Sequence, residues 1–227
     1  MKKTRVLGAV LLVGAGLACH GAGPAVQTAP APAQPAMTPA QSSQAAIAKA
    51  AADSVRHPYT KADIDFMTGM ISHHAQAILM ARWCPTHGAS SSVQTLCGRI
   101  INAQTDEINL MSQWLRDRRQ AVPEPSPHGM KMMMNGMEHV MLMPGMLTDA
   151  QLQQLDQAKG PDFDRLFLAF MIQHHQGAVA MVKTLFDSYG AGLDDLVFKF
   201  ASDVNIDQTT EIARMEKMLM AVLTTPQ

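Results

Sequence analysis

The sequence predicts an all-α protein, an antiparallel four-helix bundle made of two duplicated helical hairpins. Apolar residues recur at helical spacing in four long segments. A His-His pair occurs in the first and third of these segments, and the second and fourth share the pattern Q-x-x-E-I-x-x-M. No segment alternates convincingly between apolar and polar residues, as a half-buried β-strand would.

The ends of the helices are marked by local signals. The first helix is expected to begin after Thr60, which forms a capping box with Asp63, and to end at Pro85. The second covers about 90–118, the third opens at Pro161 and fades near 189–190, and the fourth begins near 193. Residues 148–159 predict a short additional helix between the two hairpins.

The two hairpins are similar in their residues as well as in their pattern. Aligning the two His-His pairs also aligns Asp63 with Asp164 and Met70 with Met171. The segments that follow match in the same way, QTDEINLMSQWL (104–115) with QTTEIARMEKML (208–219). Two such units within one domain indicate an internal duplication.

The N-terminal residues have the features of an export signal. Residues 1–5 carry three positive charges, and 6–18 are small and apolar but too few to span a membrane. We interpret 1–19 as a signal peptide and expect the protein in the periplasm or on the outer surface of a membrane. Lipidation at Cys19 and simple secretion both remain open, because Gly16 stands where a lipoprotein signal usually has leucine.

The segment that follows has the composition of a linker. Residues 20–52 are rich in Ala, Pro and Gln and contain almost no large apolar side chains, so we expect them to be disordered. The bundle domain is then expected at 53–225. The whole chain has a formal net charge of -1 and no basic stripe, which argues against binding to nucleic acid. Contact with a membrane is expected only through a lipid on Cys19.

The paired histidines are the first candidate metal ligands. Adjacent helical positions differ by about 100°, so one histidine of each pair, His73-His74 and His174-His175, is expected to face the core and the other a flank. Met70 and Met171 lie one turn before the pairs. A buried carboxylate is costly unless it is paired or bound to metal. Four polar residues lie near the inward stripes of the second and fourth helices, and we expect them to contact the histidines without binding the metal themselves: Gln104, Glu107, Gln208 and Glu211.

A methionine-rich segment between the hairpins, at 126–147, is the second group of candidates. Gly and Pro interrupt it, so it is unsuited to a regular core helix. Methionine fills irregular gaps in a core, but that role does not explain a preference for sulfur. Thioether and imidazole together suit copper, Cu(I) more than Cu(II). The candidate ligands here are Met130, Met132, Met133, Met134, Met137, His139, Met141 and Met143.

The histidines and the cysteines each have a simpler interpretation that needs no metal ion. The histidines could be core residues that form hydrogen bonds with the Gln and Glu side chains, and duplication would copy such a histidine without further selection. Cys84 and Cys97 bracket the first interhelix connection and would form a disulfide in an oxidising compartment, with thiolate ligands beside His87 as the alternative.

The motifs resemble one bacterial family. The patterns M-I-x-H-H-x-x-A-I-x-M, Q-x-x-E-I-x-x-M-x-x-W-L, M-P-G-M-L-T-D-x-Q-L and F-D-x-L-F-L-x-x-M-I-x-H-H-Q-G-A are similar to those of the CopM-type family, a domain of unknown function. The resemblance covers about 60–222. It implies an exported, ferritin-like four-helix bundle with members that bind copper and contribute to copper resistance. It also implies that the ligands come from the two histidine pairs, Met70, Met171 and part of the methionine-rich segment.

The leading functional hypothesis is a cell-envelope protein that binds Cu(I) for sequestration, resistance or transfer to another copper-handling envelope protein. A ferritin-like di-metal oxidase is the enzymatic alternative, but it needs Glu-x-x-His on two helices. Met70 and Met171 stand at those Glu positions, which argues against an enzyme, although Glu107 and Glu211 keep the di-metal alternative open. A metal-free interaction module with a methionine-rich contact surface is the third hypothesis.

Overall fold

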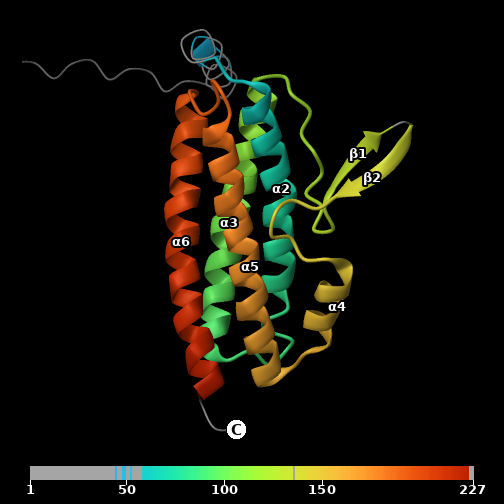
Figure 1. Cartoon of the computed structure of the whole chain (residues 1–227), viewed down its shortest axis with the longest axis vertical. Coiled ribbons are helices and arrows are strands. Elements are labelled where there is room, and N and C mark those ends of the chain that lie inside the picture. Colours follow the sequence, from blue (N-terminus) through green and yellow to red (C-terminus); the bar gives the residue numbers. More distant parts are fainter. Residues whose placement is uncertain (1–43, 45–47, 50–51, 53–57, 135, 225–227) are drawn as a thin grey trace, which may run out of the picture. The chain divides into compact units, whose positions relative to one another are not determined.

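The computed structural model describes residues 44, 48–49, 52, 58–134 and 136–224. Within 58–134 and 136–224 it contains five α-helices and one two-stranded sheet (Figure 1). In chain order the elements are α2 (Lys61–Arg82), α3 (Ser91–Asp117), β1 (Met130–Met134), β2 (Met137–Met141), α4 (Asp149–Gln157), α5 (Gly160–Asp187) and α6 (Asp195–Thr224). The predicted signal peptide with Cys19, and nearly all of the predicted linker, lie outside the described residues.

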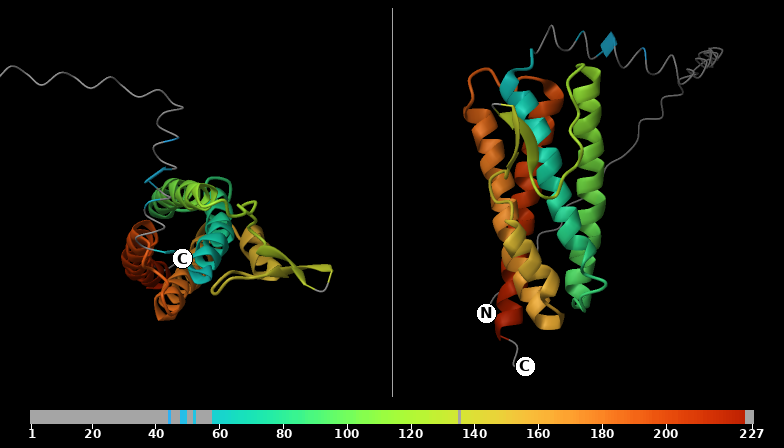
Figure 2. Two further views of the ribbon diagram at one scale, coloured as in Figure 1. Left: turned by 90° about the horizontal axis from the view of Figure 1, so that it is seen from above. Right: turned by 90° about the vertical axis from the view of Figure 1, so that its right-hand side faces the viewer.

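The predicted all-α bundle is confirmed, with a small sheet added to it. Helices α2 and α3 form one hairpin and α5 and α6 the other, and α2 packs against α5 between the two hairpins. Figure 2 shows the four long helices from above, grouped around a common core. In the part of the chain that is described, no helix is long and apolar enough to cross a membrane.

The helix ends follow the expected local chemistry. Thr60 and Asp63 form the predicted capping box at the start of α2, and Thr148 and Gln151 form another at the start of α4. Pro161 lies in the first turn of α5, where its missing N–H costs nothing. A disulfide joins Cys84 and Cys97, with their Cα atoms 6.6 Å apart, and so ties the end of α2 to the first turns of α3.

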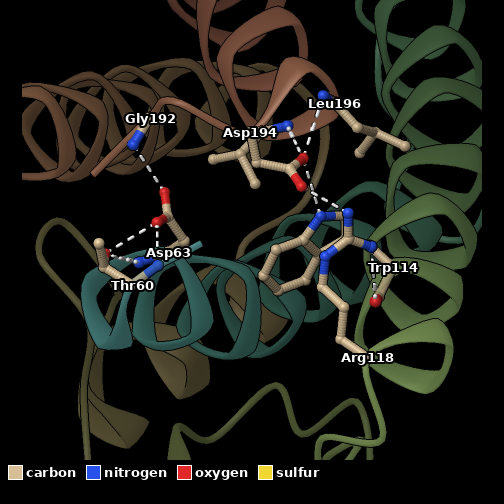
Figure 3. A network of polar contacts seen from close by, with 8 residues as sticks. Thr60, Asp63, Trp114, Arg118, Gly192, Asp194 and Leu196 are labelled. Carbon is tan, nitrogen blue, oxygen red and sulfur yellow. Dashed lines mark hydrogen bonds and ion pairs between the residues drawn. The ribbon is translucent and has the colours of Figure 1, made fainter. Parts of the chain in front are cut away.

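A buried polar network fixes one end of the bundle. Asp194, just before α6, accepts hydrogen bonds from Trp114 Nε1 and from the backbone N–H of Leu196 and Val197, all at 3.1 Å. It also forms an ion pair with Arg118, whose guanidinium lies over the Trp114 ring (Figure 3). The same network of polar contacts includes Asp63, which accepts a hydrogen bond from Gly192 N–H at 2.7 Å. These contacts join α2, α3 and the start of α6.

The expectation that no segment is a strand was wrong for the methionine-rich segment. β1 and β2 pair antiparallel in the register Met130↔Met141 and Met132↔His139, and Figure 1 shows them projecting beside the helices. The physical reason is the turn, because Gly136 has a φ of +77° and the dipeptide Asn135-Gly136 is a strong hairpin signal. The alternation of apolar and polar residues that marks a strand is missing from the sequence here, because methionines occupy both faces of the first strand.

Candidate metal site in the bundle core

Both histidine pairs lie in the middle of the bundle, and all four side chains are fully buried. The rings of His73, on α2, and His174, on α5, are in contact, with centroids 3.8 Å apart. The two members of each pair therefore face different neighbours. The second members do point away from the central contact, but their flank is covered by the neighbouring helix.

Each second histidine meets a glutamate of its own hairpin. His175 Nε2 lies 2.9 Å from Glu211 Oε2 on α6, within a hydrogen bond. His74 Nε2 lies 2.7 Å from Glu107 Oε2 on α3, an ion-pair distance without the angle of a hydrogen bond. The repeated Q-x-x-E pattern thus places one carboxylate beside one imidazole in each half of the bundle.

The first histidines bond to backbone carbonyl groups instead. His73 Nε2 lies 3.1 Å from the carbonyl oxygen of Pro144, and His174 Nε2 lies 3.0 Å from the carbonyl oxygen of His73. A carbonyl oxygen only accepts hydrogen bonds, so each Nε2 must carry the proton. In a neutral imidazole the other nitrogen, Nδ1, then presents a lone pair, which is the form that binds metals.

The backbone contact with His73 depends on a glycine in α5. The loop at 143–147 approaches α5 so closely that a Cβ on Gly177 would lie 1.9 Å from the carbonyl oxygen of Pro144. Only glycine allows this approach. Sequence reasoning did not identify Pro144 or Gly177 as part of the site, although Gly177 lies two residues after the second histidine pair, in H-H-Q-G.

The Nδ1 atoms of all four histidines are buried and have no hydrogen-bond partner among the described residues. An unpartnered buried polar atom costs about 1–3 kcal/mol, so four on two neighbouring helices are unusual in a purely structural core. Imidazole nitrogens are good ligands for Cu(I), Cu(II) and Zn²⁺. Met70 and Met171, one turn before the pairs, are also fully buried. The donor chemistry of this region therefore fits a soft metal ion.

Burial keeps the central imidazoles neutral. It lowers the pKa of His73 from 6.5 to about 3, with the charge of His74 as the next cause. It also lowers the pKa of His174 well below 6.5, with the charge of His73 next. A metal ion would therefore displace no proton from either ring at neutral pH.

The lowered pKa values predict how stability depends on pH. Between about 3 and 6.5, His73 binds a proton in the unfolded chain but not in the folded one. The free energy of unfolding of the metal-free protein should be highest above pH 6.5 and fall as the pH is lowered, by on the order of 1 kcal/mol per pH unit for each of His73 and His174. Urea unfolding between about pH 7 and pH 5 measures this slope. The double variant His73→Leu/His174→Leu should flatten it, and an equally steep slope in that variant would contradict the prediction.

An acidic cleft of about 370 Å³ lies outside the second histidines, between α3 and α6. Its lining includes Arg99 and the four polar residues of the repeated pattern, Gln104, Glu107, Gln208 and Glu211. Asp207 lines it too, and its pKa is raised by partial burial and then by the charge of Glu107. Sequence reasoning did not single out Arg99 or Asp207.

The methionine-rich hairpin forms a separate group of donors. Met133, Met137 and Met141 are exposed, whereas Met130 packs against the core at the base of the hairpin. Met143 is buried in the loop beyond β2, where its Sδ lies against Gly69 of α2. Within the described chain, no three His, Cys, Asp or Glu side chains are close enough together to hold a metal ion. A core site would therefore need two histidines with thioethers, or some rearrangement of the side chains.

The cysteines do not join these groups. Cys84 and Cys97 are linked to each other, and His87 Nε2 lies 2.8 Å from the carbonyl oxygen of Asp156. His87 thus connects the α2–α3 loop to the end of α4, and the structure favours the disulfide over the thiolate alternative.

Together, the fold and the core define a four-helix bundle with paired histidines on two facing helices. The chain belongs to the DUF305 family, described as a domain of unknown function, whose model matches residues 63–219. This confirms the family indicated by the sequence motifs.

Solved structures share this fold. A DUF305 fragment from Deinococcus radiodurans is 27% identical with a TM-score of 0.59, over 72% of this chain and 99% of that one. CopM in its Cu(I)-bound form is 26% identical with a TM-score of 0.53, over 70% of this chain and 96% of that one. CopM also has structures in Cu(II)-bound and Ag-bound forms. An uncharacterized protein of Acanthamoeba polyphaga mimivirus is 36% identical over 57 residues, which cover 25% of this chain and 38% of that protein.

Proposed function

We propose that this protein binds Cu(I) in the cell envelope and holds it for sequestration, resistance or transfer. The observation that carries the proposal is the set of four buried histidine Nδ1 atoms without a partner in the described structure. The hydrogen bonds of Nε2 leave a lone pair on Nδ1 in His73, His174 and His175. With the thioethers of Met70 and Met171 on the same helices, these atoms offer soft and uncharged ligands. The likeness to CopM, which has Cu(I)-bound, Cu(II)-bound and Ag-bound forms, supports copper as the ion, and the soft ligands favour Cu(I).

The location belongs to the same proposal. The basic and apolar start of the chain, residues 1–19, supports export to the periplasm or the outer side of a membrane, with lipidation at Cys19 as a means of anchoring. A DUF305 structural relative from Streptomyces coelicolor, 27% identical with a TM-score of 0.58 over 71% of this chain and 92% of that one, is considered a secreted protein. The partner that receives or delivers the metal would be another copper-handling envelope protein.

The hairpin offers a second set of soft ligands. Side chains that face each other across two strands lie on the same face, so Met130 and Met141 form one such pair and Met132 and His139 the next. Met137, two residues before His139, lies on this face as well. The other face carries the Lys131–Glu138 ion pair at 2.9 Å. We propose that the thioether face collects Cu(I) at the surface, apart from the core site.

A competition titration tests both parts. The purified protein is titrated with Cu(I) in the presence of a chromogenic Cu(I) chelator. We expect it to withdraw Cu(I) from the chelator, and a variant with Met130, Met132, Met137 and Met141 all replaced by leucine should bind fewer ions while keeping the tightest one. If the chelator retains all the Cu(I), the proposed function is wrong. If the leucine variant binds as many ions as the wild type, the hairpin is not a site.

A further inference from the structure

We propose that the metal ion reaches and leaves the core histidines through the cleft between α3 and α6, with Glu107 and Glu211 as the last groups it meets. This inference rests on the proposed Cu(I) function and adds the route of exchange. Among the described residues, those that line the cleft come from α3 and α6, and they include the Gln and Glu of the Q-x-x-E pattern in both halves.

The two glutamates connect solvent to the buried rings. Their side chains are 20% and 16% exposed, whereas the His74 and His175 side chains that they touch are completely buried. Each carboxylate therefore has one oxygen against an imidazole and lines the cleft as well. A cation held by such a carboxylate would lie directly outside the ring behind it.

The cleft also contains acceptors that the fold does not use. The Oε1 atoms of Gln104 and Gln208 are buried and form no hydrogen bond with any described residue, although the two side chains are only 2% and 4% exposed. Both residues line the cleft. An amide oxygen cannot donate, so it can be satisfied only by a donor or a cation. These two atoms are independent of the acidic residues, and they point to a cationic or hydrated occupant.

The charges in the cleft favour a cation. Glu107, Asp207 and Glu211 outnumber Arg99, the one basic residue in its described lining. Arg99 Nη2 lies 3.9 Å from Glu211 Oε1, and its side chain is half exposed, so it pairs only loosely with that carboxylate. A cleft lined mainly by one sign of charge raises the local concentration of the opposite ion.

The opposite side of the bundle is more closed at the histidines. There the backbone of 144–145 lies directly on α5 at Gly177, and the Pro144 carbonyl oxygen accepts from His73. A pocket of about 280 Å³ does exist on that side, and its lining includes Pro144, Met143 and Thr184. Neither this pocket nor the α3–α6 cleft is lined by a histidine, but only the cleft is lined by carboxylates that touch one, Glu107 and Glu211. The pocket provides a matched control for the route.

Blocking each opening in turn tests the proposal. In a full chain that carries Cys19→Ser, the exposed residues Ala103, in the α3–α6 cleft, and Thr184, in the opposite pocket, are changed separately to cysteine and labelled with a bulky maleimide. The protein is loaded with Cu(I), and transfer to excess chelator is followed by stopped flow. The label on Ala103→Cys should slow transfer at least about tenfold with little change in affinity, as expected when only access is altered. The label on Thr184→Cys should leave the rate unchanged.

The outcomes separate the route from the function. If the unlabelled chain binds no Cu(I), both the function and the route are wrong. If it binds Cu(I) but the label on Ala103→Cys leaves the rate unchanged, or the label on Thr184→Cys is the one that slows it, only the route is wrong.

A charge change that avoids the histidines gives a second test. Asp207→Asn removes a negative charge from the cleft, and Asp106→Asn removes one from the exposed surface of α3 outside the cleft. With Ag(I) supplied as the nitrate, the first variant should load several-fold more slowly at low salt, and the second at the wild-type rate. Equal rates in the two variants would contradict a steering role for the cleft.

Discussion

The double variant His73→Leu/His174→Leu is expected to bind Cu(I) at least about 100-fold more weakly than the wild type. Removing a residue that only forms a hydrogen bond with a metal ligand typically weakens metal binding by about 10- to 100-fold, so the loss of two ligands should exceed that. Both rings have Nε2 held by a backbone carbonyl and Nδ1 without a partner, so they are the histidines whose tautomer the fold sets for metal binding. The competition titration used for the wild type measures the loss.

The same variant separates a ligand from a structural core histidine. Leucine fills a similar volume and removes the two unpartnered Nδ1 atoms, at the cost of leaving the Pro144 carbonyl without its donor. The free energy of unfolding should therefore change by no more than about 2 kcal/mol. His128→Leu is the control, because His128 is exposed and bonds Asp149 at the surface. Unchanged Cu(I) affinity in the double variant would show that these histidines are core residues and not ligands.

The helices and the burial of the histidines could be predicted because their signals are local. Capping residues such as Thr60 act on the next three residues, and helical periodicity needs only one element. The second histidines are buried on their flank because α2 and α5 each pack against two other long helices. The buried arc of such a helix is wider than the 100° between adjacent positions, so both members of a pair fall inside it.

The rest of the site depends on contacts between distant segments. The Pro144 carbonyl meets His73 from 71 positions away in the chain. Likewise, Arg99 and Asp207 come together only because the two hairpins pack side by side. No periodicity within one segment carries this information. The duplication did indicate some of these contacts. A glutamate at the same position of both Q-x-x-E patterns is expected to contact the equivalent residue in each hairpin. In the structure those residues are His74 and His175.

The largest loss of stability is expected from Asp194→Ala, which leaves the histidines untouched. Asp194 is 1% exposed, and the Arg118 side chain that it pairs with is 7% exposed. Removing one partner of a buried ion pair typically costs about 3–5 kcal/mol, because the other charge remains buried and unpaired. The Trp114 N–H and two backbone N–H groups at the start of α6 would lose their acceptor as well. Urea unfolding of the variant measures the loss.

The control for this prediction is Asp187→Ala, which removes the same charge from an exposed pair with Lys183 on α5. It should cost less than about 1 kcal/mol. A similar cost for the two variants would show that the Asp194 network does not stabilise the fold.

The network also holds α3 to the start of α6, the two helices that border the proposed route. Asp194→Asn also leaves the Arg118 charge unpaired but keeps one acceptor oxygen for the N–H donors, so it should lose less stability than Asp194→Ala. Its Cu(I) affinity should be unchanged while its release of Cu(I) becomes faster.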